Sequence, residues 1–439
     1  MNILSALKNR VEIVDNSVTS RDLVNRFVAQ GPQEEPLHLT EVDSLVKRHY
    51  EWSLHLPRVE PFYAIKSNDE ASLVEATVLL GCGYDCASMA EVRRMLELGV
   101  DRRRIIFAQP QKTIVSLQYA REKRILTVFD SACELKKIHQ YYPEAEVLIR
   151  YRFDSRNSVT NLGVKFGCET EKESKQLLNL AKELGINVIG WCFNVGSGCR
   201  DASIFYDAIK KGREIHDYAT TIGFKFTMID LGGGFLGDKG NGISQYADYI
   251  NRALDECYPK EENVSIIAEP GRFYCAAAVT TIIPVHGKRV LFNDNDPLKI
   301  EHISYYFNDG MYGTFYSAKY RNQKLHPIIW KSGVDLELTY RTTLFGPTCD
   351  GNDAFAKDLD LPQLEVSDFV IFENQGAYAR VHSCRFNGFC LPKVTNFIRK
   401  RTWELLETLS KSPNPTQVLL NNEYLQKNYN IEKLTFEAN

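Results

Sequence analysis

The most suggestive reactive group in the sequence is Lys66, which follows the apolar residues FYAI in PFYAIKSN. Four apolar neighbours predict that the root of this side chain is buried. A desolvated lysine amine has a depressed pKa and is nucleophilic, so it can form a Schiff base with an aldehyde. The alternative is a lysine at the exit of a strand that simply reaches solvent.

Two glycine-rich segments, GSG at 196–198 and GGG at 232–234, each follow a predicted strand. Glycine allows backbone N–H groups to approach an anion closely, and a helix N-terminus adds a favourable dipole. Arg272 follows the next predicted strand and is suited to bidentate contact with phosphate. Tight turns alone also explain such glycines, but their position beside Arg272 favours a phosphate site.

Glu269 lies in IIAEPGR, at the end of the last of these strands. A carboxylate buried there needs a cationic partner or a protonated ring nitrogen. Together these residues describe a site for pyridoxal phosphate. Lys66 would hold the aldehyde, the glycine segments and Arg272 would hold the phosphate, and Glu269 would keep the pyridine nitrogen protonated. A protonated ring is the stronger electron sink for a carbanion.

A second candidate group lies far along the chain, in GPTCDGND at 346–353 and ENQGAY at 373–378. The flanking Gly and Pro place Cys349 and Asp350 on a turn, where they could act as a proton donor and a substrate-binding carboxylate. A surface turn with an incidental cysteine is the alternative. Tyr378 follows a glycine turn and is a candidate phosphate ligand.

The residues proposed to hold pyridoxal phosphate can form one site only if the ends of their strands lie close together. Eight short segments rich in Val, Ile and aromatic residues alternate with helical segments between about residues 60 and 275, and several are almost continuously apolar, as in strands buried on both faces. Asn68-Asp69, Ser88 and Ser131 stand at expected N-cap positions. Eight β-then-α units fit a (β/α)8 barrel, whose functional residues lie at the carboxyl ends of its strands. An open doubly wound sheet is the competing arrangement. The predicted strands are 60–66, 83–88, 104–110, 125–130, 146–153, 187–198, 226–234 and 264–272.

After residue 275 the sequence changes to strands at short spacing with turn residues between them, which predicts an all-β domain, a sandwich or small barrel. Residues 1–37 contain VEIVDN and no clear helix, so we expect them to add a strand to this domain. From about residue 393 the chain reads as helical and then polar. The predicted division is a barrel at 38–275 and a β-domain made of 1–37 and 276–439. The expected strands are 276–292, 302–309, 314–320, 326–333, 336–346 and 368–374.

Composition sets the class of protein. With 439 residues, 44% hydrophobic and 25% charged, the chain is globular, with two or three domains. A net charge of −3 gives no reason to expect nucleic acid or an anionic membrane as a partner. No apolar run is long enough to span a membrane and the N-terminus lacks a secretory apolar region, so a cytoplasmic protein is expected. Eleven cysteines without C-x-x-C spacing indicate reduced thiols rather than a zinc site.

Ten motifs occur in order along the chain: PFYAIKSN, GYDCAS, VKFG, FNVGSGC, IDLGGGF, AEPGRFY, NDGMYGTF, GPTCDGND, ENQGAYA and FNGF. From about residue 10 to 395 the chain therefore resembles the eukaryotic ornithine decarboxylase family of barrel-type pyridoxal phosphate decarboxylases. The resemblance implies a (β/α)8 barrel with a β-domain. It also implies decarboxylation of an L-amino acid, first of all ornithine to putrescine in polyamine biosynthesis. A homodimer is implied too, in which Cys349 and Asp350 reach the partner's active site.

The resemblance also implies roles for individual residues. Lys66 would carry the cofactor, Cys349 would protonate the α-carbon after CO2 leaves, and Asp350 would hold the distal amine of the substrate. Further cofactor contacts are implied for Asp85, Arg150, Asn194, Ser197, Gly232, Gly233, Gly234, Glu269, Gly271, Arg272 and Tyr378, and further substrate contacts for Tyr320, Arg321 and Phe386.

Two residues depart from the family pattern. Asn194 stands where the family usually has a His stacked on the cofactor ring, and an amide cannot reproduce that stacking. Arg321, in KYRN, aligns with an Asp that helps to bind the distal ammonium. Two cations ~4 Å apart repel by roughly 1 kcal/mol in water and by several in a shielded cleft. Either Arg321 turns away, or the substrate is lysine, arginine, or a neutral or acidic amino acid. Asp350 could also pair with Arg321 itself, which would leave a neutral pocket for an apolar or polar side chain.

The competing function is that of a non-catalytic binding protein, similar to the antizyme inhibitors that share this fold, with an antizyme-like regulator as its partner. Asn194 and Arg321 favour this interpretation. The retained Lys66, Glu269 and Cys349 favour an enzyme.

Overall fold

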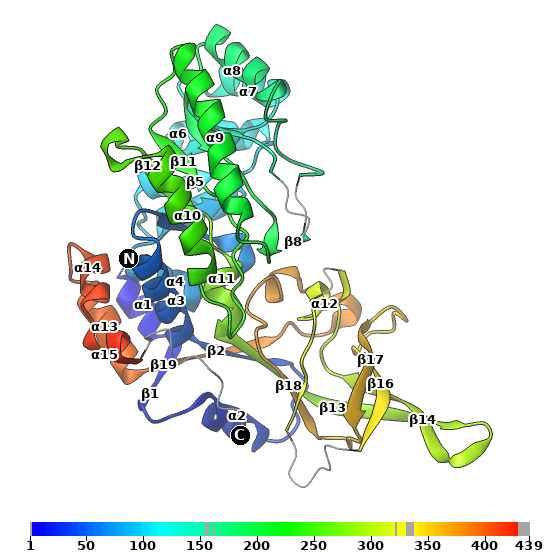
Figure 1. Cartoon of the computed structure of the whole chain (residues 1–439). Helices are drawn as coiled ribbons and strands as arrows, with labels where there is room; N and C mark the ends of the chain where they lie inside the picture. Colours follow the sequence, from blue (N-terminus) through cyan, green and yellow to red (C-terminus); the bar gives the residue numbers. More distant parts are fainter. Residues whose placement is uncertain (1, 154–157, 161–162, 321–322, 331–337, 429–439) are drawn as a thin grey trace. The chain divides into compact units, whose positions relative to one another are not determined.

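A computed structural model describes residues 2–153, 158–160, 163–320, 323–330 and 338–428 (Figure 1). The chain divides into two compact units. One comprises Met1–Asn9, Leu45–Tyr274 and Leu405–Asn439, and we call it the barrel unit. The other comprises Arg10–Ser44 and Cys275–Glu404, and we call it the β unit. This division differs from the predicted domain boundaries, which assigned both ends of the chain to the β-domain.

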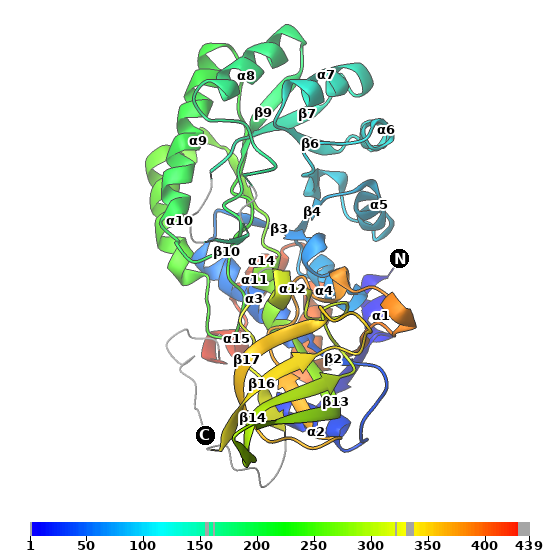
Figure 2. The ribbon, with the colours of Figure 1, turned by 90° about the vertical axis from the view of Figure 1, so that its right-hand side faces the viewer.

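The barrel unit is built on eight parallel strands that close in the order β11-β12-β3-β4-β5-β6-β7-β9. Figure 2 shows the helices α5 to α10 around the outside of these strands. The closed barrel confirms the predicted (β/α)8 fold, and each of its strands lies within a predicted segment. The strands are β3 (Glu60–Ala64), β4 (Gly83–Cys86), β5 (Ile105–Phe107), β6 (Leu126–Phe129), β7 (Glu146–Arg150), β9 (Asn187–Cys192), β11 (Met228–Asp230) and β12 (Ser265–Ala268).

Each barrel strand is followed by a helix. Ser88 and Ser131 cap two of these helices as predicted, accepting the backbone N–H groups of Glu91 and Glu134. The predicted Asn68-Asp69 cap was wrong, because the N-cap of α4 is Glu70, which makes no side-chain capping bond. The helices are α4 (Ala71–Leu79), α5 (Met89–Glu97), α6 (Ile114–Lys123), α7 (Ala132–Tyr141), α8 (Glu173–Glu183), α9 (Ile204–Thr221), α10 (Ser244–Cys257) and the short α11 (Arg272–Cys275).

Side chains from the barrel strands fill the interior of the barrel. Phe62, Ile106, Val128, Leu148 and Ile267 are almost fully buried and belong to one apolar cluster. In barrels of this kind the carboxyl ends of the strands carry the chemistry.

The β unit contains a nine-stranded mixed sheet with the order β1-β19-β2-β13-β14-β16-β17. The long strand β13 pairs with β2 and β18 through its first half and with β14 through its second half, and β18 also pairs with β15. As predicted, VEIVDN supplies a strand to this sheet. The strands are β1 (Val11–Val14), β2 (Leu37–Glu41), β13 (Val279–Asn293), β14 (Asp296–Phe307), β15 (Ile328–Trp330), β16 (Thr339–Phe345), β17 (Ala354–Pro362), β18 (Phe369–Phe372) and β19 (Lys393–Arg399).

Three expectations for the β unit and the chain ends were wrong. Segment 314–320 forms the helix α12 (Tyr316–Tyr320), in which Tyr316 and Tyr320, four residues apart, bring their ring centroids to 4.9 Å. Residues 393–399 form β19, because they pair in parallel with β2 and β1. Residues 1–37 contain two helices. The remaining elements are α1 (Ile3–Lys8), α2 (Ser20–Val28), α3 (Val42–His55), α13 (Lys400–Leu409), α14 (Pro415–Leu420), α15 (Glu423–Asn428) and the ribbon of β8 (Ser158–Thr160) with β10 (Ser197–Cys199).

Candidate active site

Lys66 lies in a short 3-10 turn directly after β3, at the carboxyl end of the barrel. Its Nζ forms an ion pair with Oδ2 of Asp85, on the neighbouring strand β4. The Lys66 side chain is 39% exposed, whereas that of Asp85 is fully buried. Within the described residues, Oδ1 of Asp85 has no hydrogen-bond partner. The lysine is therefore held by a buried carboxylate rather than released to solvent, and its amine stays accessible.

Two buried carboxyl groups lie at the ends of the last two barrel strands. Asp230 ends β11, where its Oδ1 accepts the Gly232 N–H at 2.8 Å, and Glu269 follows β12, where its N–H donates to Gly232 O at 2.7 Å. Burial raises the pKa of Asp230 to about 7. Burial also raises the pKa of Glu269 well above its usual range, and the charges of Asp230 and Asp85 raise it further. This pair therefore retains a proton close to neutral pH.

Sequence reasoning had quoted IDLGGGF but had not assigned a role to Asp230. The signal was present, because a carboxylate at the last position of a barrel strand lies where functional residues gather. Two cations, Lys66 and Arg150, lower the pKa of Glu269 and so oppose the effect of burial. Arg150 ends β7, and its guanidinium lies 5.3 Å from the centre of the Phe166 ring.

The glycines after β11 are required by close contacts of the backbone. Gly232 has φ +61°, and a Cβ added there would lie 2.0 Å from Phe193 O. Gly234 has φ +123°, and its Cβ would lie 2.6 Å from Val195 Cγ2. The Cys199 N–H donates to Gly234 O at 2.8 Å, which joins the two glycine segments. The segments therefore form one compact structure at the barrel mouth.

Ser197 and Arg272 meet at the same place. The Arg272 Nε donates to Ser197 Oγ at 3.3 Å, and Arg272 is 7% exposed. Gly271 approaches the turn that carries the lysine so closely that an added Cβ would lie 2.8 Å from Ser67 Cβ. The strand ends of the barrel thus bring together a lysine amine, buried carboxyl groups, and a glycine cradle with an arginine and a hydroxyl.

This donor set fits pyridoxal phosphate. Lys66 offers an amine for the aldehyde, and a carboxyl group of raised pKa such as Glu269 shares a proton readily with a pyridine nitrogen. Asp85 presents an unsatisfied oxygen beside them. The cradle around Gly232–Gly234, with Ser197 and Arg272, supplies the donors that a phosphate needs.

The second predicted group lies in the β unit, around Asp350. The Tyr312 hydroxyl donates to Asp350 Oδ2 at 2.5 Å, and the Asn352 N–H donates to Oδ1 at 2.9 Å. These bonds lower the pKa of Asp350, so its carboxylate is charged at neutral pH. Phe386 lies against Tyr312, with ring centroids 4.6 Å apart. The exposed Cys349 donates its backbone N–H to Asn387 Oδ1 at 3.0 Å.

The other residues predicted for this group are less tightly connected. Tyr378 has φ +56°, and its carbonyl accepts the Ser317 hydroxyl at 3.0 Å. Tyr320 ends α12 and is 59% exposed. Arg321 lies outside the described residues. Tyr312 was missed from the sequence, although NDGMYGTF was noted, because only the fold reveals its contact with Asp350.

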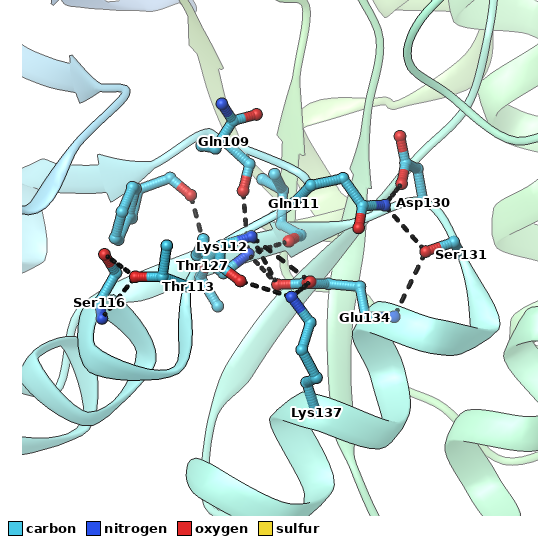
Figure 3. Close-up of polar contacts among 12 residues, drawn as sticks. Gln109, Gln111, Lys112, Thr113, Ser116, Thr127, Asp130, Ser131, Glu134 and Lys137 are labelled. Atoms are coloured by element: carbon cyan, nitrogen blue, oxygen red, sulfur yellow. Dashed lines mark hydrogen bonds and ion pairs between the residues drawn. The ribbon is translucent and has the colours of Figure 1, made fainter.

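A buried ionic network braces the loop after β5 (Figure 3). Lys112 Nζ lies 2.9 Å from Glu134 Oε1, and both side chains are fully buried. Burial lowers the pKa of Lys112 to about 8. The neighbouring Gln111 donates to Asp130 Oδ1 at 2.9 Å, and Asp130 accepts the Gly167 N–H, also at 2.9 Å. The network therefore links three loops at the carboxyl ends of β5, β6 and β7. Sequence analysis had not identified it.

Among the described residues, no group of three or more His, Cys, Asp or Glu side chains is arranged to hold a metal ion. No helix in the described part of the chain is long and apolar enough to cross a membrane.

Comparison with known proteins identifies the family. Residues 42–276 match the family model for the pyridoxal binding domain of pyridoxal-dependent decarboxylases. The chain belongs to the pyridoxal-dependent decarboxylase family. It is 35% identical over 418 residues to ornithine decarboxylase from Mus musculus, covering 92% of this chain and 90% of the relative. It is likewise 35% identical over 415 residues to antizyme inhibitor 2 from Xenopus laevis, covering 92% and 91%.

A solved relative has the same architecture. The structure of Paramecium bursaria Chlorella virus arginine decarboxylase bound to agmatine matches with a TM-score of 0.79 and 34% identity, covering 86% of this chain and 99% of that one. The chain is thus an amino-acid decarboxylase that uses pyridoxal phosphate. The family assignment confirms the predicted resemblance, enzyme class and cofactor.

Proposed function

We propose that the decarboxylase acts on L-ornithine and forms putrescine, the substrate indicated by the names of several relatives. The observation that supports a cationic amino acid most directly is Asp350. Its carboxylate is held by Tyr312 and Asn352, and its pKa is lowered. A charged carboxylate with a fixed orientation suits the distal ammonium of a diamino acid.

Within this proposal the barrel unit holds the cofactor. Lys66 would hold the cofactor at its aldehyde, and Arg272, Ser197 and the glycine segments would hold its phosphate. Glu269 holds a proton on the pyridine nitrogen, with Asp230 beside it. The bound cofactor supplies an electron-poor ring that accepts the electron pair left at the α-carbon when CO2 departs.

Residues of the β unit complete the reaction. Cys349 returns a proton from Sγ to the α-carbon, and Asp350 fixes the far end of the substrate. Phe386 and Tyr320 offer apolar surface to the methylene chain, and Tyr378 adds a phosphate contact. Arg321 remains the residue whose orientation decides between ornithine and another amino acid.

CO2 release from a panel of L-amino acids, with purified protein and saturating pyridoxal phosphate, tests the proposed substrate. Release from ornithine supports it, and exclusive release from lysine, arginine or another member refutes it. Lys66→Ala should abolish turnover, while Lys136→Ala, at an exposed lysine on α7, should leave it unchanged. Turnover by the Lys66→Ala protein would contradict the role given to this amine.

We further propose a homodimer with shared sites and a cytoplasmic location. The dimer is supported by the exposure of Cys349, whose thiol serves the reaction only if substrate reaches it from outside the β unit. If sites are shared, mixing inactive Lys66→Ala and Cys349→Ala proteins restores part of the activity, because mixed dimers contain one intact site. Failure to restore activity in a mixture that has exchanged subunits refutes sharing. Fractionation of expressing cells tests the location.

A second candidate function is that of an antizyme-inhibitor-like protein. Its support is the relative named antizyme inhibitor 2, together with Asn194 in place of the family's usual His. Absence of CO2 release from every amino acid, with tight binding to an antizyme, would favour this function. Cofactor loading and turnover without antizyme binding would exclude it.

A further inference from the structure

Asn194 lies two residues after the end of β9, and its side chain lies beside both glycine segments of the barrel mouth. Its Oδ1 accepts the Gly196 N–H at 2.9 Å. Its Nδ2 lies beside the second segment, since a Cβ added at Gly233 would be 3.6 Å from that nitrogen. We propose that Asn194 is a positioning residue for the phosphate cradle, and that it acts on the cofactor through the backbone of residues 196–198 rather than by contact with the ring.

The backbone around Asn194 explains why such a residue matters. Gly196 and Gly198 have φ +94° and +70°, so the segment is folded into turns that few other residues adopt. Ser197, between them, accepts a hydrogen bond from Arg272 at 3.3 Å. The amide of Asn194 fixes the turn that precedes Ser197. It thereby orients the Ser197 hydroxyl and the neighbouring backbone N–H groups, which would hold the phosphate.

The GGG segment at 232–234 also depends on the position of residues 194–196. An added Cβ at Gly234 would lie 2.9 Å from Gly196 O, and one at Gly232 would lie 3.1 Å from Asn194 Cα. Displacement of residues 194–196 would therefore disturb the GGG segment as well. An Asx turn of this kind is formed by the short amide of Asn, whereas a His at 194 would place a ring where the amide now accepts the Gly196 N–H.

The proposal rests on the cofactor and phosphate contacts proposed above, and it is tested by binding without turnover. Dissociation constants for pyridoxal phosphate, pyridoxal and inorganic phosphate are measured for Asn194→Ala by equilibrium dialysis. Loss of one hydrogen bond in the cradle should weaken pyridoxal phosphate and phosphate roughly three- to tenfold. Pyridoxal, which lacks the phosphate, should bind as it does to the unmodified protein.

Two variants serve as controls. Asn194→Ser offers a weaker acceptor for the same turn, so its affinity for pyridoxal phosphate should fall between those of Asn194→Ala and the unmodified protein. Asn187→Ala replaces an exposed asparagine at the opposite end of the same strand and should change nothing. Equal weakening of pyridoxal and pyridoxal phosphate by Asn194→Ala would overturn the proposal in favour of ring contact. If Asn194→Ala leaves the affinities for pyridoxal phosphate and for inorganic phosphate unchanged, the proposal is refuted.

The binding test of Asn194 does not depend on which amino acid the protein decarboxylates. If the protein binds pyridoxal phosphate and the Asn194 variants behave as expected, the inference stands whichever amino acid is decarboxylated. If ornithine is decarboxylated but Asn194→Ala binds all three ligands normally, the proposed function stands and the inference fails.

Discussion

The buried pair Lys112–Glu134 predicts a large and specific loss of stability when one partner is removed. Glu134 accepts from Lys112 at 2.9 Å and from Lys137 at 2.6 Å. Lys112 also donates to the carbonyl groups of Gln109 at 2.9 Å and Val128 at 2.7 Å. Glu134→Gln keeps the size of the side chain but leaves the Lys112 ammonium buried without its counter-ion.

The expected magnitude follows from the burial of both side chains. Breaking one partner of a buried pair costs about 3–5 kcal/mol, whereas replacing both by apolar residues is often close to neutral. At about 2–4 °C per kcal/mol for a unit of this size, Glu134→Gln should lower Tm by roughly 6–20 °C. The double variant Lys112→Met/Glu134→Leu should be more stable than Glu134→Gln alone.

The pH dependence of the free energy of unfolding provides a second test, because the direction of the change can be worked out. The pKa of Lys112 is about 8 in the folded protein and 10.5 as its ordinary value, so the folded state releases this proton first. The contribution of Lys112 to the free energy of unfolding therefore rises as the pH increases from about 8 to 10.5. Without Glu134 the pKa of Lys112 falls further, because the attraction that raised it is lost. The rise should then begin below pH 8.

Thermal unfolding by circular dichroism at pH 6 to 9 measures both effects. Lys137→Met is the matched control, since its ammonium contacts the same carboxylate but is 26% exposed, and it should cost no more than about 1 kcal/mol. If Glu134→Gln and Lys137→Met lower Tm equally, or if Glu134→Gln leaves the pH profile unchanged, the reasoning from burial is refuted.

Three further predictions concern the barrel. Asp230→Asn should flatten a fall in Tm of the cofactor-free protein as pH rises from about 4 to 7. The pKa of Asp230 is about 7 when folded and 3.8 ordinarily, so in this range the folded state keeps a proton that the unfolded state releases, and stability falls with pH. Gly190→Ala should abolish soluble expression, because its Cβ would lie 1.7 Å from Met228 O, whereas Gly242→Ala has its nearest neighbour at 3.7 Å and should express normally. Arg272→Met should weaken pyridoxal phosphate at least tenfold and pyridoxal much less, as dialysis would detect; equal weakening of both ligands would exclude its proposed phosphate contact.

Much of the barrel could be predicted from the sequence, because strands buried on both faces carry a local signal. A run such as IIF in β5 or IIA in β12 is apolar throughout, and helices such as α5 and α7 begin at serine caps that can be recognised without knowledge of the fold. The β unit was harder to predict. KVTNFIR reads as the start of a helix until β2 and β1 are known to lie beside it, and pairing across the chain has no local sequence signal.

The residues of the candidate site also differ in how well the sequence predicts them. Lys66, Glu269 and the glycines were predictable because each stands at the end of a predicted strand. Asp230 was overlooked although it also ends a strand. Lys112 and Tyr312 could not be predicted, because their roles depend on partners far away in the sequence, as with Tyr312 and Asp350.

The pairing of β1 with β19 has a consequence for synthesis of the chain. Val11 lies opposite Asn396, and nearby the Arg401 N–H donates to Asn16 at a separation of 385 residues. At about 5–20 residues per second, a ribosome needs roughly 20 to 80 s to add that length. The first strand therefore emerges long before its partner exists. During this time its backbone groups lack the partner that β19 later provides, which leaves them open to pairing with other strands.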